Sequence, residues 1–313
     1  MTGQLEILEG GLLTTIQDQG RFGYRKYGVP VSGAVDSHSA ELANWLAGNY
    51  KKAPVIECTL IGPTLKFNSD AVIGISGSGG AVHLNGDERV INETIRVKTD
   101  DVLKIGHLEK GCRLYIAIKG EWELESMMGS FSTCLQAIFG GYSGRKLKSG
   151  DSICWECEED DTAKRKTPKK LIPHFSTRQL IRIMPGPEWN WISEDEQFKF
   201  LDTDFSILDS SNRMGVRLKS LEKITLQKDN MKSGPVVPGT IQLPPNGNPI
   251  ILMNDAQSVG GYPRIAKIAE ADVWRLGQLW KGNKINFSLI ERDKAIQLLK
   301  YLNNLKKDLL ADQ

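Results

Sequence analysis

The chain has 313 residues, enough for about two domains, and 40% of them are hydrophobic and 25% charged. This composition excludes wholesale disorder and a fibrous repeat, so we expect a globular protein. The 40 basic and 38 acidic side chains give a formal charge of +2, which is too balanced for a nucleic-acid-binding protein.

Short β-branched runs dominate the chain, and they are punctuated by 31 glycines and 13 prolines. Turns containing Gly-Asp or Asp-Asp precede several apolar stretches, as in LNGDERV, TDDVLKIG and KSGDSICW. Strands bounded by such turns are typical of barrels and sandwiches. The clearest predicted strands span 5–8, 71–75, 113–118, 181–184, 249–253 and 283–290.

Three internal helices are predicted from their end signals. Asp36 is a plausible N-cap and Gly48 a plausible stop for the first helix. A second helix is predicted over 132–141, where it ends in a glycine pair. Ser193 and Glu196 have the spacing of a capping box and predict the third.

The C-terminal segment predicts a fourth helix with one apolar stripe, which begins after Glu291. We expect this stripe to be buried, either on the chain's own barrel or against a partner. Its members are Ala295, Leu298, Leu299, Leu302, Leu305 and Leu309.

Charge changes abruptly where ECEEDD is followed by TAKRKTPKK, a pattern typical of a solvated linker or hairpin tip. The alternative is that the basic block touches an anionic partner. We expect an N-terminal β-rich half over 1–158, a charged linker or hairpin over 159–172, a C-terminal barrel half over 173–290 and a helix over 291–313.

The cysteines and the lengths of the apolar runs indicate the cellular compartment in which the protein is expected. Five cysteines are a sparse, odd-numbered set that suits a reducing compartment. Cys154 and Cys157 form a lone CxxC, which offers two thiolates where structural zinc needs four ligands. No apolar run approaches the roughly 18 residues of a membrane helix, and MTGQLEILEG is unlike a signal peptide. We therefore expect a cytoplasmic protein.

Several familiar motifs fail on spacing. The stretch GISGSGGAV, 74–82, has Val82 where the third glycine of GxGxxG is required, so we interpret it as a tight loop between two strands. Its alternative is a nest of backbone amides that binds an anion. The sequence contains no P-loop, no GxSxG elbow and no zinc spacing of histidines. Ser233 follows Met231 and Lys232 where a biotin acceptor has a second methionine, so we expect no biotin attached to this chain.

Polar residues gather beside glycines in TTIQDQGRFGYRKYGVPVSGAVD, SSNRMGVRL and GTIQLPPNGNPIILMNDAQSVGGYPRIAKI. Glycine lets a ligand approach the backbone, an arginine fork binds carboxylate or phosphate, and an aspartate takes a proton or holds Mg²⁺. The alternative is a set of tight barrel turns that contain buried Arg–Asp pairs. The residues concerned are Gln17, Asp18, Arg21, Arg25, Asp36, Arg213, Arg217, Gln242, Asp255, Gln257, Tyr262 and Arg264.

These clusters resemble the carboxyltransferase A/B-type family, as do APVIECTLIGPTLKF, GSFST with GGYSGRKLKSGD, and RIMPGPE. The family includes the C subunit of ATP-dependent 5-oxoprolinase, the KipA proteins and one portion of urea amidolyase, formerly called allophanate hydrolase subunit 2. The resemblance implies a mainly β chain with a few helices, built as two β-rich halves that contain cyclophilin-like β-barrel units.

The resemblance also implies that the chain is one component of an enzyme complex. Because the sequence has no complete nucleotide motif and its polar clusters look like half of a composite site, we expect the chain to be inactive alone. The leading hypothesis is the C subunit of a multi-subunit 5-oxoprolinase, which converts 5-oxoproline to L-glutamate with ATP and Mg²⁺ at the assembled complex. Its implied partners are a KipI-like chain, the B subunit of 5-oxoprolinase, and a LamB/YcsF-like A subunit. The alternatives are a biotin-dependent carboxyltransferase subunit of the urea amidolyase type and a KipA-like regulator that binds a KipI-like kinase inhibitor.

Under the leading hypothesis the polar clusters hold the site. Asp255 is the expected Mg²⁺ ligand or base, and Arg213 and Arg217 are the expected clamps for phosphate or carboxylate. The residues expected to bind substrate are Gln242, Gln257, Tyr262, Asp18, Arg21 and Asp36.

Overall fold

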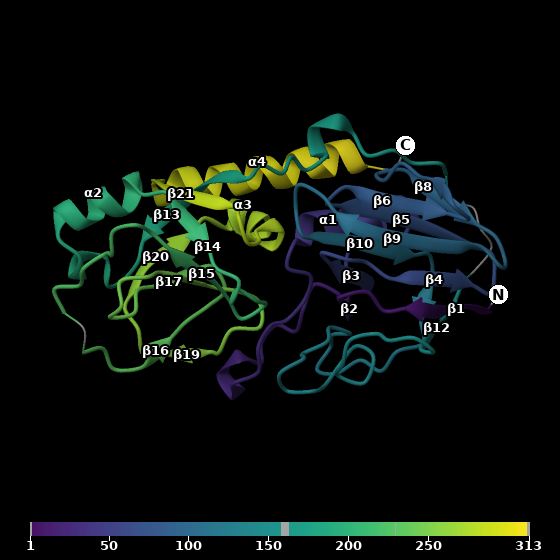
Figure 1. Cartoon of the computed structure of the whole chain (residues 1–313), viewed down its shortest axis with the longest axis horizontal. Coiled ribbons are helices and arrows are strands. Elements are labelled where there is room, and N and C mark those ends of the chain that lie inside the picture. The colour runs from purple at the N-terminus through teal and green to yellow at the C-terminus, as the bar shows by residue number, and fades with distance from the viewer. Residues whose placement is uncertain (1, 158–162, 229, 312–313) are drawn as a thin grey trace. The chain divides into compact units, whose positions relative to one another are not determined.

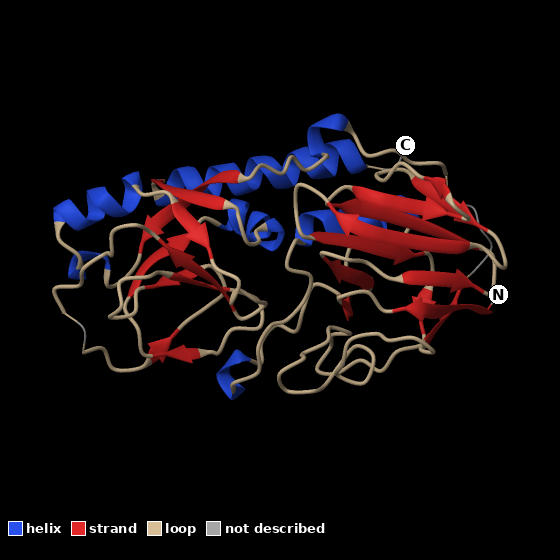
Figure 2. Cartoon of the chain, in the orientation of Figure 1, coloured by secondary structure: helices blue, strands red, loops and turns tan. Residues whose placement is uncertain are grey.

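The computed structural model describes residues 2–157, 163–228 and 230–311 and is mainly β with a few helices, which confirms the predicted fold class (Figures 1 and 2). The chain divides into two compact units. Unit 1 comprises Met1–Arg21 and Ser32–Phe175, and unit 2 comprises Phe22–Val31 and Ser176–Gln313. The short segment Phe22–Val31 therefore belongs to a different unit from the residues on either side of it.

The described residues of unit 1 form two sheets, one long helix and a short 3-10 turn. Its elements are β1 (Thr2–Glu9), β2 (Leu13–Gln17), α1 (Ser37–Ala47), β3 (Val55–Thr59), β4 (Thr64–Phe67), β5 (Ala71–Gly77), β6 (Gly80–Leu84), β7 (Asp87–Glu88), β8 (Thr94–Val97), β9 (Val102–Leu108), β10 (Arg113–Ile118), β11 (Glu121–Trp122), β12 (Ser152–Glu156) and η2 (Lys169–Leu171). One sheet has the strand order β11-β12-β1-β4-β9-β6-β7, and the other β2-β3-β10-β5-β8. Alternating apolar residues of both sheets form one buried core.

Helix α1 begins and ends where its sequence signals predict. The carboxylate of Asp36 accepts a hydrogen bond from the backbone N–H of Ser39 at 2.9 Å, and Gly48 ends the helix with a φ of 80°. The helix packs closely on β5, because a Cβ on Gly74 would lie 2.1 Å from the carbonyl oxygen of Ala43. The glycine-rich stretch is thus two strands, β5 and β6, with a tight loop between them, as interpreted.

The predicted helix over 132–141 is wrong. Ile138, Gly140 and Gly141 all have a positive φ, which a right-handed helix does not accommodate. Long-range bonds organise the segment instead, since the backbone N–H of Thr133 donates to the carbonyl of Ile16 at 2.9 Å. Local end signals could not reveal this competition, because the partner lies far away in the sequence.

The basic block after the acidic run packs on unit 1 where the structure describes it. Arg165 donates to the carbonyl of Trp45 at 2.7 Å and lies over its ring, and Leu171 is buried. The acidic end of the expected linker, 159–162, lies outside the described residues.

Unit 2 is built around a closed barrel with the strand order β13-β20-β17-β18-β15-β14-β21. Strands β13 and β21 run parallel, and the other neighbouring strands of the barrel run antiparallel. The elements are η1 (Arg25–Tyr27), β13 (Arg178–Pro185), η3 (Trp189–Trp191), α2 (Glu194–Asp202), β14 (Phe205–Ile207), β15 (Gly215–Lys219), β16 (Gly234–Pro235), β17 (Thr240–Gln242), β18 (Ile250–Leu252), β19 (Val259–Gly260), β20 (Arg264–Ile268), α3 (Glu270–Val273), η4 (Trp274–Gln278), β21 (Lys284–Leu289) and α4 (Arg292–Leu310).

Helix α2 attaches to the barrel through aromatic packing. Phe200 is fully buried, and its ring stacks on that of Phe287 at a centroid distance of 4.9 Å. Ser193 caps the helix by accepting from the backbone N–H of Glu196 at 3.3 Å. The Glu196 carboxylate accepts from the backbone N–H of Thr225 at 2.8 Å, so it also holds a distant loop.

Helix α4 follows the predicted apolar stripe, but the stripe is only partly covered. Ala295 is buried, whereas Leu298, Leu299, Leu302, Leu305 and Leu309 are half-buried. No helix in the described part of the chain combines the length and the apolar character that crossing a membrane requires. The five cysteines, all of which lie among the described residues, form no disulfide.

The aromatic packing of α2 leads to a stability prediction with an internal control. Phe200→Ala removes a fully buried ring and should lower the free energy of unfolding by about 3–5 kcal/mol. Phe198→Ala, two residues away on the same helix, removes a ring that is 73% exposed and should change it by less than about 0.5 kcal/mol. Chemical denaturation of both variants measures the difference, and equal losses would contradict the packing described.

Candidate functional site

Arg213 and Asp255 form a buried ion pair in unit 2. Arg213 lies in the turn before β15, and Asp255 in the loop after β18. The guanidinium donates from Nε to Oδ2 at 2.8 Å and from Nη2 to Oδ1 at 3.2 Å, and both residues are 5% exposed. The backbone joins them as well, because the N–H of Asp255 donates to the carbonyl of Arg213 at 2.9 Å. The pair thus ties two barrel loops together, and the arginine fork is occupied by a carboxylate of the protein itself.

Arg217 does not join this pair. It lies on β15, where Val216 and Leu218 are buried and Arg217 is exposed. Because side chains alternate along a strand, Arg217 shares the outer face with Lys219. The two arginines that the sequence brings within four residues therefore do not act as one clamp in this structure.

A loop cluster, defined here as segments 234–239 and 253–262, lies before β17 and after β18. The two segments pair through β16 and β19, and the backbone N–H of Val236 donates to the carbonyl of Ser258 at 3.0 Å. Val236, Leu252 and Ala256 form a buried apolar group at their base. The cluster is consequently a well-supported part of the barrel end.

Gln242 and Tyr262 are linked at this cluster. Gln242 is 1% exposed and donates from Nε2 to the carbonyl of Tyr262 at 3.0 Å. A Cβ on Gly260 would lie 2.6 Å from that amide nitrogen, so glycine permits the close approach. The Tyr262 side chain is 45% exposed and Gln257 is exposed, which leaves both accessible to a ligand.

Arg264 and Glu188 form a second pair, in which Glu188 was not a site candidate from the sequence. The guanidinium donates from Nε to Oε2 at 2.9 Å and from Nη2 to Oε1 at 2.6 Å. These hydrogen bonds hold the pKa of Glu188 below its ordinary value of 4.5. Arg264 also donates from Nη1 to the carbonyl of Pro235 at 3.0 Å, so it holds the loop cluster in place. The motif RIMPGPE, which carries Glu188, is the sequence signal for this pair.

Arg25 reaches the loop cluster from the segment Phe22–Val31. Its Nη2 donates to the carbonyl of Val236 at 2.6 Å and to the carbonyl of Gln257 at 2.9 Å. Burial lowers the pKa of Arg25 from its ordinary value. The sequence placed Arg25 in a polar cluster without singling it out, since only folding assigns this segment to unit 2.

Asp18 and Arg21 belong to unit 1, whereas the barrel candidates belong to unit 2. The Asp18 carboxylate accepts from the hydroxyl of Ser130 and from the backbone N–H of Phe131, both at 2.7 Å. Arg21 is fully buried, donates from Nη2 to the carbonyl of Ser132 and lies over the Phe139 ring. Both side chains are therefore engaged in holding the loop 127–139.

Asp36 belongs to a buried network in unit 1. Its backbone N–H donates to the hydroxyl of Tyr115 at 2.9 Å, and that hydroxyl donates to Glu57 at 2.8 Å. Burial raises the pKa of Tyr115 well above its ordinary value, with the Glu57 charge as a second cause. Asp36 also caps α1, so its contacts are those of a fold-organising residue.

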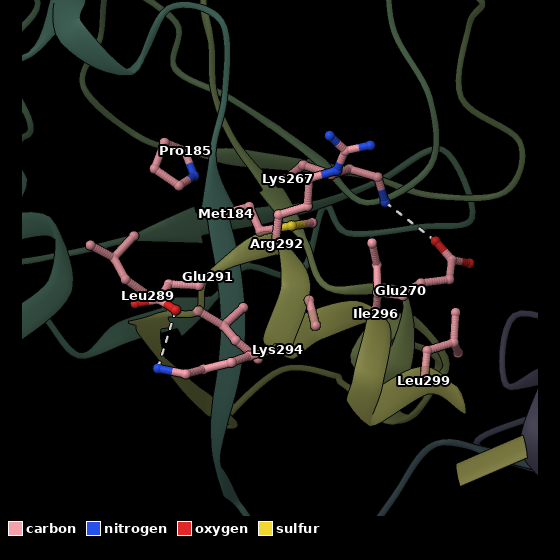
Figure 3. A pocket seen from close by; sticks show the side chains of 12 residues that line it. Met184, Pro185, Lys267, Glu270, Leu289, Glu291, Arg292, Lys294, Ile296 and Leu299 are labelled. Carbon is pink, nitrogen blue, oxygen red and sulfur yellow. Dashed lines mark ion pairs between the residues drawn. The ribbon is translucent and has the colours of Figure 1, made fainter. Parts of the chain in front are cut away.

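A pocket of about 800 Å³ lies in unit 2 beside the first turns of α4 (Figure 3). Apolar side chains such as Met184 and Leu299 share its wall with charged ones. Lys267 pairs with Glu270 at 3.7 Å, and burial lowers the pKa of Lys267. None of the sequence-predicted site residues lines this pocket, so it is separate from the loop cluster.

The described residues do not form a metal site on their own. Both carboxylate oxygens of Asp255 accept from Arg213. Across 2–157, 163–228 and 230–311, no group of three or more His, Cys, Asp or Glu side chains could hold a metal ion. Asp255 as a Mg²⁺ ligand stays a prediction that requires ligands from elsewhere.

The buried pair leads to a test that separates packing from catalysis. Asp255→Asn leaves the buried Arg213 charge without its carboxylate, so the free energy of unfolding should fall by about 3–5 kcal/mol. Asp209→Asn breaks the exposed pair with Lys281 and should cost less than about 1 kcal/mol. Denaturation curves compare the two variants. Lost turnover of an assembled complex with unchanged stability would instead identify Asp255 as a catalytic base or metal ligand.

The Arg264–Glu188 pair predicts that the stability of the fold depends on pH. Because the pKa of Glu188 is lowered in the folded state, its stabilising contribution is present above pH 4.5 and is lost as pH falls through the lower folded value. Glu188→Gln should therefore be less stable at neutral pH, with the difference from wild type shrinking between about pH 5 and pH 3. Glu222→Gln removes an exposed carboxylate and is the control. If the difference in the free energy of unfolding between Glu188→Gln and wild type stays constant with pH, the ionisation of Glu188 is not its source.

The chain has relatives among known proteins. It matches the carboxyltransferase domain family, subdomain A and B, over residues 27–289. It is 36% identical to the C subunit of 5-oxoprolinase from Escherichia coli (strain K12) over 294 residues, which cover 94% of this chain and 93% of that protein. It is 31% identical to the C subunit of 5-oxoprolinase from Haemophilus influenzae over 307 residues, which cover 97% and 98%.

A solved structure extends the comparison to a larger enzyme. The crystal structure of the Kluyveromyces lactis urea amidolyase superposes with a TM-score of 0.90 at 33% identity. The match covers 98% of this chain but only 20% of the amidolyase chain. The matched family region contains the barrel strands and the candidate residues from Arg213 to Arg264. The chain therefore belongs to the carboxyltransferase domain family, subdomain A and B.

Proposed function

We propose that this chain is the C-type subunit of a 5-oxoprolinase, which opens the ring of 5-oxoproline to give L-glutamate. One observation carries the proposal: two proteins named as the C subunit of 5-oxoprolinase match it over 93% and 98% of their own lengths. A match that spans both whole chains supports the same role better than a match to part of a larger enzyme.

The chemistry of the substrate explains why the chain should work within a complex. The carbonyl of a lactam is stabilised by amide resonance, so water attacks it slowly at neutral pH. Phosphorylation of its oxygen by ATP would create a good leaving group and an electrophilic carbon. This chain lacks a P-loop, and its described residues form no metal cluster, so we assign ATP and Mg²⁺ to the assembled complex. The partners in the proposal are a KipI-like B subunit and a LamB/YcsF-like A subunit.

The loop cluster is the part of this chain that suits substrate binding. Tyr262 and Gln257 are exposed there, and the buried amide of Gln242 adjoins them through the Tyr262 carbonyl. Amide and phenol groups can donate to the oxygen of a lactam and accept from its N–H. The Arg213–Asp255 pair holds the loop on which Gln257 lies, so we propose it as a positioning pair.

A carboxyltransferase subunit of the urea amidolyase type is the second candidate. The observation in its favour is the TM-score of 0.90 with the Kluyveromyces lactis urea amidolyase. In such a role the loop cluster would receive the carboxybiotin of another chain, and a nitrogen of urea would accept the carboxyl group as the biotin is released. Because the match covers only 20% of the amidolyase chain, the functions of the rest of that chain would have to come from separate chains.

Reconstitution tests the proposal. The chain purified alone should release no glutamate from 5-oxoproline above the rate without enzyme, because its polar clusters form only part of a site. Co-purified with a KipI-like B subunit and a LamB/YcsF-like A subunit, it should release glutamate only when ATP and Mg²⁺ are present. Glutamate release is measured directly in both preparations.

Three controls make the outcome decisive. Omission of ATP tests the need for activation, and omission of this chain tests whether it is required. Urea with carboxylated biotin tests the second candidate. Turnover of 5-oxoproline by the isolated chain, or by a complex that lacks it, would overturn the proposal, and carboxyl transfer to urea without 5-oxoproline turnover would favour the alternative.

A further inference from the structure

The hydrogen-bond acceptors of Arg25 are neutral backbone groups, whereas several other arginines of unit 2 lie close to a carboxylate. The acceptors of Arg25 are two backbone carbonyls, those of Val236 and Gln257. Elsewhere in the unit, several buried or half-buried arginines lie within 4.0 Å of a carboxylate. These ion pairs are Arg182–Asp272, Arg213–Asp255, Arg264–Glu188 and Arg275–Asp272.

The second terminal nitrogen of Arg25, Nη1, has no acceptor from the protein among the described residues. Nη1 is a buried donor without an acceptor within the part of the chain that the structure describes. Such a donor is unfavourable, because burial removes the water that would otherwise accept its hydrogen bond. The carbonyls that hold Nη2 are neutral, so they do not compensate the charge of the guanidinium. A negatively charged ligand would accept the hydrogen bond of Nη1 and compensate the charge of the guanidinium. Because Nη1 is shielded from solvent, the surrounding loops would have to move to admit such a ligand.

The surroundings of Arg25 are prepared for an anion. The acidic side chains that hold the neighbouring loops are already neutralised, Asp255 by Arg213 and Glu188 by Arg264. Repulsion of an incoming anion is thereby reduced. The two carbonyl contacts also hold the guanidinium in one orientation, so less side-chain entropy is lost when a ligand binds.

We propose that Arg25 binds the carboxylate of the substrate at the loop cluster. The inference rests on the proposed function, because 5-oxoproline carries one carboxylate on an otherwise uncharged lactam. In this role Arg25 makes the site select a lactam that carries a carboxylate over a lactam that lacks it. The exposed groups of Gln257 and Tyr262 on the same cluster then face the lactam.

The test compares 5-oxoproline with 5-oxoprolinamide, in which an uncharged amide replaces the carboxylate. Binding of each compound to the assembled wild-type complex is measured by calorimetry, and the KM for 5-oxoproline by glutamate release. Arg25→Gln should weaken binding of 5-oxoproline and raise its KM by about 10- to 100-fold, while binding of 5-oxoprolinamide changes by less than about twofold. Arg25→Lys keeps the charge without the fork and should lie between the two.

Lys26→Gln is the matched control, because Lys26 is the next residue of η1 and is exposed beside the Tyr27 ring. It should leave both measurements unchanged. Melting curves of the complexes show whether the Arg25 variants remain folded. If neither Arg25→Gln nor Arg25→Lys assembles into a complex, binding to the wild-type complex still tests the inference. Equal binding of 5-oxoproline and 5-oxoprolinamide to that complex overturns it.

The two proposals fail in distinguishable ways. A wild-type complex that binds 5-oxoproline through Arg25 without hydrolysing it overturns the proposed function and retains the carboxylate site. A complex that hydrolyses 5-oxoproline with an unchanged KM in folded Arg25→Gln retains the function and overturns the site. A complex that neither binds nor hydrolyses 5-oxoproline overturns both.

Discussion

The hydrogen bonds of Asp18 fix the place where the chain leaves unit 1. Its carboxylate holds Ser130 and Phe131, and its backbone carbonyl accepts from the N–H of Ala34 at 2.8 Å. The last bond joins the two flanks of the segment Phe22–Val31, so the segment begins and ends at one point. Arg25 lies on this segment, which belongs to unit 2 although both of its flanks belong to unit 1.

Charge neutralisation is the main constraint within unit 2. A buried arginine without a carboxylate is costly, and several arginines around this barrel have one. The Arg213–Asp255 pair therefore holds the loops in place, and its two charges compensate each other instead of being available to a ligand. At Arg25, by our proposal, an anion from outside the chain would compensate a buried positive charge.

The family accommodates more than one chemistry on one scaffold. Its members include proteins named as the C subunit of 5-oxoprolinase and proteins named urea amidolyase. Because a fold does not specify a reaction, the difference has to come from side chains at the site and from partner chains. The carboxylate-binding role that we propose for Arg25 would be such a difference, since 5-oxoproline carries a carboxylate and urea does not.

The sequence alone determined the mainly β character, helices α1 and α4, the cap of α2 and the family, because caps, periodicity and contiguous motifs are local signals. Tertiary structure decided which polar residues neutralise one another. Arg213 meets Asp255 from 42 positions away, and Arg217 faces outward because of the alternation of β15 in the barrel. It also assigned Phe22–Val31 to unit 2 and replaced the predicted helix at 132–141 by long-range bonds. Partners this distant in sequence leave no local pattern, so only the folded chain identifies them.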